Sequence, residues 1–145
     1  MSLPPNSSCL SKQLALKELF LKAKSEEEKY ELIIELGRHV KPLAAAYKTE
    51  EAIVRGCQST VYLHSELKEG SVYFEAESDA LISAGLAELL IRTFSGEKPD
   101  VILTCPPSFI EEIGISESLT PNRANGLYSI HLRMKQDALK HLVQK

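Results

Sequence analysis

The stretch TVYLHSELKEGSVYFEA, residues 60–76, decides the fold that we expect for this chain. Its apolar residues share one parity on each side of the turn KEG, with Val61, Leu63 and Leu67 before it and Val72, Phe74 and Ala76 after it. Alternation of this kind is typical of strands with one buried face, and a glycine between two such runs is typical of a tight turn. The stretch therefore predicts an antiparallel β-hairpin.

Two helices are expected before the hairpin. The segment SKQLALKELFLKAK, residues 11–24, repeats its apolar residues at helical spacing. Ser25 and Glu28 then form a capping box for a second helix, which Gly37 is expected to end. Residues 39–56 have weaker periodicity and are expected to be a connection with a helical turn or two.

Another helix is expected directly after the hairpin. Ser78 and Asp79 are suitable N-caps for a helix over residues 80–94, which should cover the sheet. The run VILT, residues 101–104, is a candidate third strand of that sheet.

Two proline-led helices follow. A double proline precedes FIEEI, residues 109–113, which predicts a short helix that Gly114 ends. Thr120 before Pro121 has the pattern of an N-cap followed by proline in the first helical position, so a last, long helix is expected there. Runs of helix, then strands, then helices are typical of an α+β fold.

The length of 145 residues fits one globular domain, and the balance of 43% hydrophobic and 26% charged residues agrees with it. We therefore expect a single domain over residues 1–145, in which a small antiparallel sheet packs against several helices. Residues 1–10 are expected to be a flexible N-terminal leader.

Charge and hydropathy exclude several classes of function. The formal net charge is −3 and no basic cluster occurs, so a nucleic-acid partner is not expected. No apolar run approaches the length of a membrane span, and no signal peptide is recognisable. Three widely spaced cysteines do not form a disulfide framework and suit a reducing compartment, so we expect a cytoplasmic protein.

Cys57 has the surroundings of a reactive thiol. Arg55 precedes it by two residues, Gly56 adjoins it, and the polar residues Gln58 and Ser59 follow. A nearby cation favours the thiolate, which is the attacking form, and a glycine allows a loop to turn. Packing remains the alternative, because a cysteine in a folded protein is commonly a small buried hydrophobic residue.

The other cysteines and the histidines give weaker signals. Cys105 follows an apolar run and is expected to pack in the core, and Cys9 in the leader is given no role. His64, the histidine nearest to Cys57 in sequence, has strand parity opposite to Leu63 and is expected to face solvent rather than act as a base. Close cysteine pairs of the CxxC type do not occur, so no metal site is expected.

Four blocks of this sequence, in this order and spacing, resemble the SufE family. They are EEEKYELIIELG at residues 26–37, GCQSTVYL at 56–63, ESDALISAGL at 77–86 and LTPNRANGL at 119–127. Tyr62 departs from the pattern, because the family commonly has tryptophan there. The resemblance implies a SufE-like fold related to that of the IscU proteins.

The resemblance also implies an activity. SufE proteins accept sulfur from a cysteine desulfurase as a persulfide, stimulate that enzyme, and pass the sulfur to the SufBCD scaffold for iron–sulfur cluster assembly. Cys57 matches the acceptor position, and the desulfurase would be of the SufS type or, for a CsdE-like protein, of the CsdA type. No cofactor of its own is implied.

Two further residues take expected roles from the resemblance. Arg123 matches an arginine expected near the acceptor cysteine, where its charge would favour the thiolate or persulfide anion. Asp79 is placed beside the acceptor loop or at a partner contact, with helix capping as the alternative. Two alternatives to the carrier role stay open: an IscU-like metal or cluster scaffold with Cys57 as a ligand, and an adaptor in which Cys57 only packs.

Overall fold

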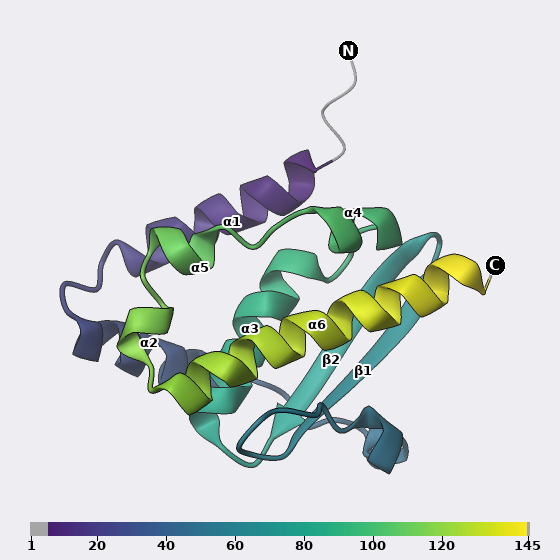
Figure 1. Ribbon diagram of the computed structural model, residues 1–145, viewed down its shortest axis with the longest axis horizontal. Coiled ribbons are helices and arrows are strands. Elements are labelled where there is room, and N and C mark those ends of the chain that lie inside the picture. Colours follow the sequence, from purple (N-terminus) through teal and green to yellow (C-terminus); the bar gives the residue numbers. More distant parts are fainter. Residues whose placement is uncertain (1–5, 145) are drawn as a thin grey trace.

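The computed structural model, which describes residues 6–144, confirms the α+β fold (Figure 1). Helices stand before and after one antiparallel hairpin, as the sequence predicts. In chain order the elements are α1 (Ser7–Phe20), α2 (Glu26–Arg38), η1 (Ala45–Tyr47), η2 (Glu50–Ala52), β1 (Val61–Lys68), β2 (Ser71–Ser78), α3 (Leu81–Phe94), α4 (Pro99–Thr104), α5 (Phe109–Glu112), η3 (Ser116–Ser118) and α6 (Pro121–Val143).

The hairpin pairs β1 with β2 in a register that runs from Val61 opposite Ser78 to Lys68 opposite Ser71. Its turn residues Glu69 and Gly70 both have positive φ, 51° and 83°, a conformation that fits a two-residue hairpin turn. One face of the hairpin is apolar and turned to the core. The buried residues on that face are Val61, Leu63, Val72, Phe74 and Ala76.

Helix α3 lies at the centre of the molecule (Figure 1). Its apolar residues are not confined to one stripe, and Leu86, Leu89 and Leu90 are each at most 1% exposed. A helix that is hydrophobic on most sides is a core helix, because each side must be covered. Accordingly β2, α1, α2 and α6 all contact α3.

Helix α2 begins as expected but does not end as expected. The Ser25 hydroxyl accepts a hydrogen bond from the Glu28 amide at 3.1 Å, which confirms Ser25 as the N-cap, and it lies 3.5 Å from the Glu28 carboxylate. Gly37 is not a stop, because the helix continues to Arg38. A methyl group at Gly37 would collide with the Leu81 carbonyl oxygen of α3, so this glycine allows two helices to cross closely.

The candidate third strand is wrong. Residues 101–104 lie in α4, because Pro99 at the first helical position and Asp100 in the first turn favour a helix start. The edge of β2 pairs instead with a residue shortly before α4, since the Val72 amide donates to the Glu97 carbonyl at 2.9 Å. Within residues 6–144 the sheet therefore has two strands.

The starts of two helices also differ from the prediction. Ala80, not Asp79, is the N-cap residue of α3, and the Asp79 side chain is exposed. Helix α1 begins at Ser7, so the later part of the expected leader is helical, and residues 1–5 lie outside the described residues. Cys9 is 0% exposed because it extends the buried face of α1, which Gln13 and Leu16 continue.

The remaining predicted elements are present, although the first helix, expected to reach residue 24, ends at Phe20. Short turns of helix, η1 and η2, occupy the connection before the hairpin, and α5 ends before Gly114. Thr120 caps α6 by accepting from the Arg123 amide at 3.4 Å. Among the described residues no helix is both long and apolar enough to cross a membrane.

Candidate functional site

Cys57 lies in a short loop between η2 and β1 whose base is closed by strand-like pairing. The Val54 amide donates to the Val61 carbonyl at 2.8 Å, and Ile53 forms an antiparallel bridge with Tyr62. Residues 55–60 therefore leave the edge of β1 and return to it. We call these residues the Cys57 loop.

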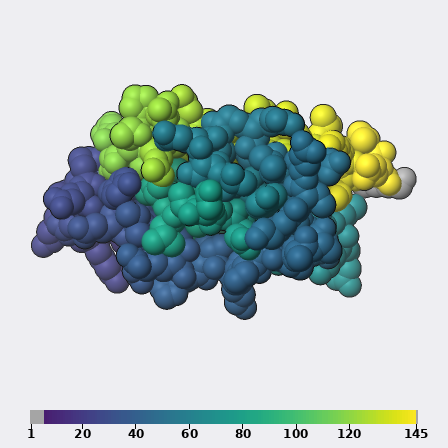
Figure 2. Space-filling view, turned by 90° about the horizontal axis from the view of Figure 1, so that it is seen from below, coloured from purple at the N-terminus to yellow at the C-terminus, as the bar shows by residue number. Residues whose placement is uncertain are grey.

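The Cys57 loop rests on helix α6. Gly56 has φ +92°, a left-handed conformation that side chains rarely adopt, and a Cβ there would collide with the Ser129 hydroxyl of α6. In Figure 2 atoms of the segment leading into β1 adjoin the light-green atoms around the start of α6 on this face. Glycine is thus favoured at this position by its left-handed conformation, whereas rotation of the Ser129 hydroxyl would relieve most of the collision.

The Cys57 thiol is seated against the backbone of α6. Its Sγ lies 3.7 Å from the Gly126 carbonyl oxygen, to which the thiol donates. A Cβ at Gly126 would lie 3.9 Å from the same sulfur, which is an ordinary contact distance, so the thiol does not press on the α6 backbone. Cys57 is half-buried and packs against the edge of the core. The loop therefore shelters the thiol.

We call the part of α6 that contacts the Cys57 loop, Gly126 and Ser129, the seat. Its electrostatics favour the protonated thiol. Burial raises the pKa of Cys57, because the thiolate is the form that loses hydration. The Gly126 carbonyl acts in the same direction, since it can only accept a hydrogen. The role of Arg55 stays a prediction, because its side chain is exposed and makes no hydrogen bond to Cys57 within the described residues. The cysteine is therefore held at rest rather than activated.

Arg123 lies one helical turn before Gly126, on the same side of α6. Its Nη1 is buried and makes no hydrogen bond within residues 6–144. A buried guanidinium donor without a partner is costly, and an anion is the partner that it suits best. The structure thus brings an unsatisfied cationic donor to the part of α6 that carries the Cys57 seat.

The other expected loop residues have peripheral places. Gln58 is exposed and Ser59 is half-buried, and neither side chain bonds to Cys57. Asp79 follows Ser78, whose hydroxyl donates to the Thr60 carbonyl at 2.8 Å at the end of the Cys57 loop. The Asp79 side chain therefore lies exposed near the loop without taking part in the seat.

Sequence reasoning missed the α6 half of the seat, Gly126 and Ser129. One signal was present, because a glycine inside a helical pattern often has a packing or functional reason. The family block LTPNRANGL includes Gly126 but predicts no contact for it. Which segment approaches this glycine cannot be read from helical periodicity.

The histidines occupy other places. His64 stacks on Tyr47 with ring centroids 3.6 Å apart and lies 3.2 Å from Glu66, on the hairpin face away from the core. His131 stacks on Phe94 across the α3–α6 contact. Within residues 6–144, no three histidine, cysteine, aspartate or glutamate side chains gather as a metal ion would require.

The other two cysteines lie together in the core. Cys9 and Cys105 are 0% and 2% exposed, and the Gln13 amide lies 3.6 and 3.7 Å from their sulfur atoms. Burial raises the pKa of Cys9 to about 12. Cys105 packs as expected, and Cys57 alone among the three has partial access to solvent.

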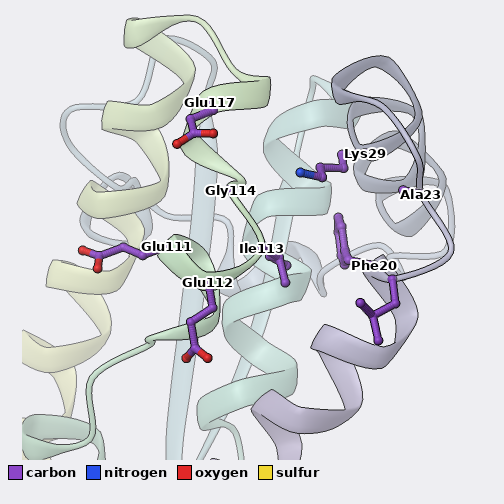
Figure 3. Close-up of a pocket in the computed structure, with 9 residues that line it drawn as sticks. Phe20, Ala23, Lys29, Glu111, Glu112, Ile113, Gly114 and Glu117 are labelled. Atoms are coloured by element: carbon purple, nitrogen blue, oxygen red, sulfur yellow. The ribbon is translucent and has the colours of Figure 1, made fainter.

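A separate hollow of about 390 Å³ lies between α1, α2 and α5 (Figure 3). Its wall includes Phe20 and Ile113, and the charged side chains around it include Lys29 and Glu117. None of its lining residues belongs to the Cys57 loop. This hollow is not part of the candidate site.

Comparison with known families gives one match. Residues 14–138 match the model of SufE, described as an Fe-S metabolism associated domain. This span begins within α1 and ends within α6, so it includes the Cys57 loop and its seat.

Individual relatives agree with this match. The chain is 36% identical over 138 residues to an uncharacterised SufE-like protein of Synechocystis sp., covering 95% of this chain and 83% of that protein. It is 41% identical over 107 residues to the cysteine desulfuration protein SufE of Plasmodium vivax, covering 71% of this chain and 42% of that longer protein. The solution structure of a hypothetical protein from Thermus thermophilus superposes with a TM-score of 0.75 at 27% identity, covering 99% of this chain and 100% of that one.

Proposed function

Because this chain belongs to the SufE family, we propose that it accepts sulfur from a cysteine desulfurase on Cys57 and carries it as a persulfide. The observation that carries the proposal is the seat of Cys57. The thiol stands at the tip of a loop whose turn favours glycine, half-buried against α6, whereas Cys9 and Cys105 are closed in the core. A carrier needs this combination of shelter and access.

The transfer is an exchange between two sulfur atoms and needs no external oxidant. The Cys57 thiolate attacks the outer sulfur of the desulfurase persulfide and forms a new S–S bond, while the old S–S bond breaks. The desulfurase cysteine leaves as a thiolate, and the outer sulfur stays on Cys57. Such an exchange requires an ionised and accessible nucleophile but no fixed general base.

The Cys57 thiol must therefore lose its proton when it leaves the seat. Burial and the Gly126 carbonyl both keep Cys57 protonated in the resting position. We assign to Arg123 the stabilisation of the thiolate or persulfide anion, since its buried Nη1 lacks a partner within the described residues. The resting protein would thus protect its thiol from oxidation until a partner draws the loop out.

The same proposal extends to the partners. The donor would be a SufS-type or CsdA-type desulfurase, which this protein would stimulate by removing its product. The recipient would be the SufBCD scaffold, which builds iron–sulfur clusters in the cytoplasm. The carrier would need no cofactor of its own, because the sulfur is its cargo.

The decisive experiment is mass spectrometry of the loaded protein. The protein is incubated with a SufS-type desulfurase and L-cysteine, and intact and peptide masses are read without reductant. One added sulfur atom is expected on Cys57. The Cys57→Ser variant should gain none, and the Cys105→Ala variant should load like the unaltered protein. Absence of added sulfur beside an active desulfurase would overturn the carrier role.

The role of Arg123 is tested by the rate of the same transfer. Arg123→Ala should slow loading of Cys57 about three-fold, because a pKa raised by one unit lowers the thiolate fraction about ten-fold while the more basic thiolate is about three-fold more nucleophilic. Arg123→Lys should restore part of the rate, because it restores the charge without the planar donors. Lys135→Ala on the same helix is the control and should load normally. Equal rates for all variants would remove Arg123 from the mechanism.

A further inference from the structure

The segment that leads into the Cys57 loop is tied to α6 by one arginine. Arg133 Nη1 donates to the Ile53 carbonyl at 3.0 Å, and Nη2 donates to the Glu51 carbonyl. Both carbonyls belong to the stem, residues 51–54, which immediately precedes the Cys57 loop. A guanidinium can hold two backbone oxygens at once because its donors are fixed in a planar fork.

Arg133 is itself held in position by Asp137 of the same helix, which in turn is bonded to β1. Its Nε donates to Asp137 Oδ1 at 3.1 Å, and the two side chains are only 19% and 10% exposed. The other carboxylate oxygen of Asp137 accepts from the Ser65 hydroxyl of β1 at 3.1 Å. Ser65 also lies 3.0 Å from His141 Nε2. The network therefore joins α6, the stem and β1.

The stem and the tip of the loop are held with unequal strength. Hydrogen bonds from a charged donor to carbonyl oxygens are about twice as strong as neutral ones. Among the described residues, the tip, residues 55–59, is held by a weak thiol donor 3.7 Å from the Gly126 carbonyl and by the approach of Gly56 to Ser129, whereas Thr60 at the end of the loop accepts from the Ser78 hydroxyl. A loop of this kind can release its tip while its stem stays in place.

We propose that Arg133 is a positioning residue for sulfur transfer, because it fixes the stem on α6 so that only residues 55–59 move and then return to the Gly126 seat. Its importance for transfer rests on the proposed carrier role of Cys57. The restraint on the loop does not, and the two are tested by separate measurements.

The restraint is tested by alkylating the native protein with iodoacetamide and measuring the rate at each cysteine by peptide mass spectrometry. In the double variant Arg133→Ala/Asp137→Asn, which leaves no unpaired buried carboxylate, Cys57 should react about ten-fold faster because its open state is more populated. Cys9 and Cys105 are the internal standards and should keep their rates, since they are exposed only when the core opens.

A conservative variant and a control separate geometry from charge. Arg133→Lys keeps the charge beside Asp137 but lacks the planar fork that reaches Asp137 and both carbonyls at once, so Cys57 should again react faster. Lys135→Ala removes a neighbouring cation from the same helix and should change nothing. The proposal is overturned if Cys57 keeps its rate, if all three cysteines speed up together, or if Arg133→Lys behaves as the unaltered protein.

The consequence for transfer is measured with a SufS-type desulfurase and L-cysteine. The double variant should show a several-fold higher KM as sulfur acceptor, and its loaded persulfide should be lost several-fold faster to added reductant. Unchanged values for both would overturn the role in transfer. If the unaltered protein gains no sulfur on Cys57, the carrier function fails, while the alkylation rates still decide whether Arg133 restrains the loop.

Discussion

At the scale of single residues, the thiol of Cys57 is protected rather than activated. Burial raises its pKa, and the Gly126 carbonyl accepts its hydrogen. Because oxidation and alkylation both proceed through the thiolate, a resting thiol of this kind reacts slowly with small molecules. Under the proposed function, sulfur would then be delivered by a protein that moves the loop rather than by a small molecule.

The pH dependence of alkylation tests this protection. For a pKa raised by burial, the rate at native Cys57 should still increase at alkaline pH where the rate for the same cysteine in the urea-unfolded chain has levelled off. The measurement is the iodoacetamide rate at Cys57 across the alkaline range in both states. Superimposable profiles would show that the seat does not affect ionisation.

At the scale of elements, two helices approach more closely than ordinary side chains allow. Gly37 of α2 and Gly85 of α3 face the backbone of the opposite helix, and a Cβ at Gly85 would collide with the Ile33 carbonyl oxygen. Such a crossing fixes where α3 lies, and α3 in turn covers the hairpin that carries the Cys57 loop. Small residues at the crossing thus contribute to the placement of the site.

Substitution at this crossing should therefore be costly. Gly85→Ala should lower the free energy of unfolding by about 3 kcal/mol, since backbone atoms must move apart to relieve the collision. Gly126→Ala is the matched substitution within a helix, where the new methyl group meets Cys57 Sγ at an ordinary 3.9 Å. Denaturant unfolding should show little loss for it, because alanine favours a helix. Similar losses for both variants would contradict the close crossing.

At the scale of the whole molecule, a two-stranded sheet is stable because helices bury its apolar face. Helices α3 and α6 pack together beside it, and their contact includes His131, whose ring stacks on Phe94 with centroids 5.2 Å apart. Burial lowers the pKa of His131 to about 4, and Lys135 adds to the effect. The folded state therefore contains a neutral histidine that the unfolded state would protonate first.

Stability should consequently fall in acid. Because the folded pKa lies below the ordinary value of 6.5, the unfolded state binds this proton first, and stabilisation is lost as pH falls from about 6.5 to about 4. His131 should account for about 1–2 kcal/mol of that loss, since its ring is only partly buried.

The variant His131→Phe keeps an aromatic ring against Phe94 and should lose this part of the acid sensitivity. His39→Gln changes an exposed histidine and should retain it. Urea unfolding at a series of pH values gives the comparison. The assignment fails if His131→Phe and the unaltered protein lose stability in parallel.

The sequence predicted best those features that depend on residues close together in the chain. The N-caps at Ser25 and Thr120 and the hairpin with its glycine turn are set by neighbours a few residues away, and each is predictable from the sequence. The run VILT is ambiguous, because a short apolar run fits a strand or a buried helix equally well. Its proline start and the pairing of Glu97 with β2 decide for a helix.

The candidate site likewise combines features set by local sequence with contacts between distant segments. By itself the sequence determined the hairpin and the order of the helices, and it singled out Cys57 as the candidate acceptor, because periodicity, capping and motif are local properties of a chain. Only the tertiary structure decided that Cys57 is sheltered by Gly126, that Arg55 is exposed, and that Arg133 holds the stem. These contacts join segments about 70 to 80 residues apart, and the burial that raises the pKa of the thiol exists only when those segments meet.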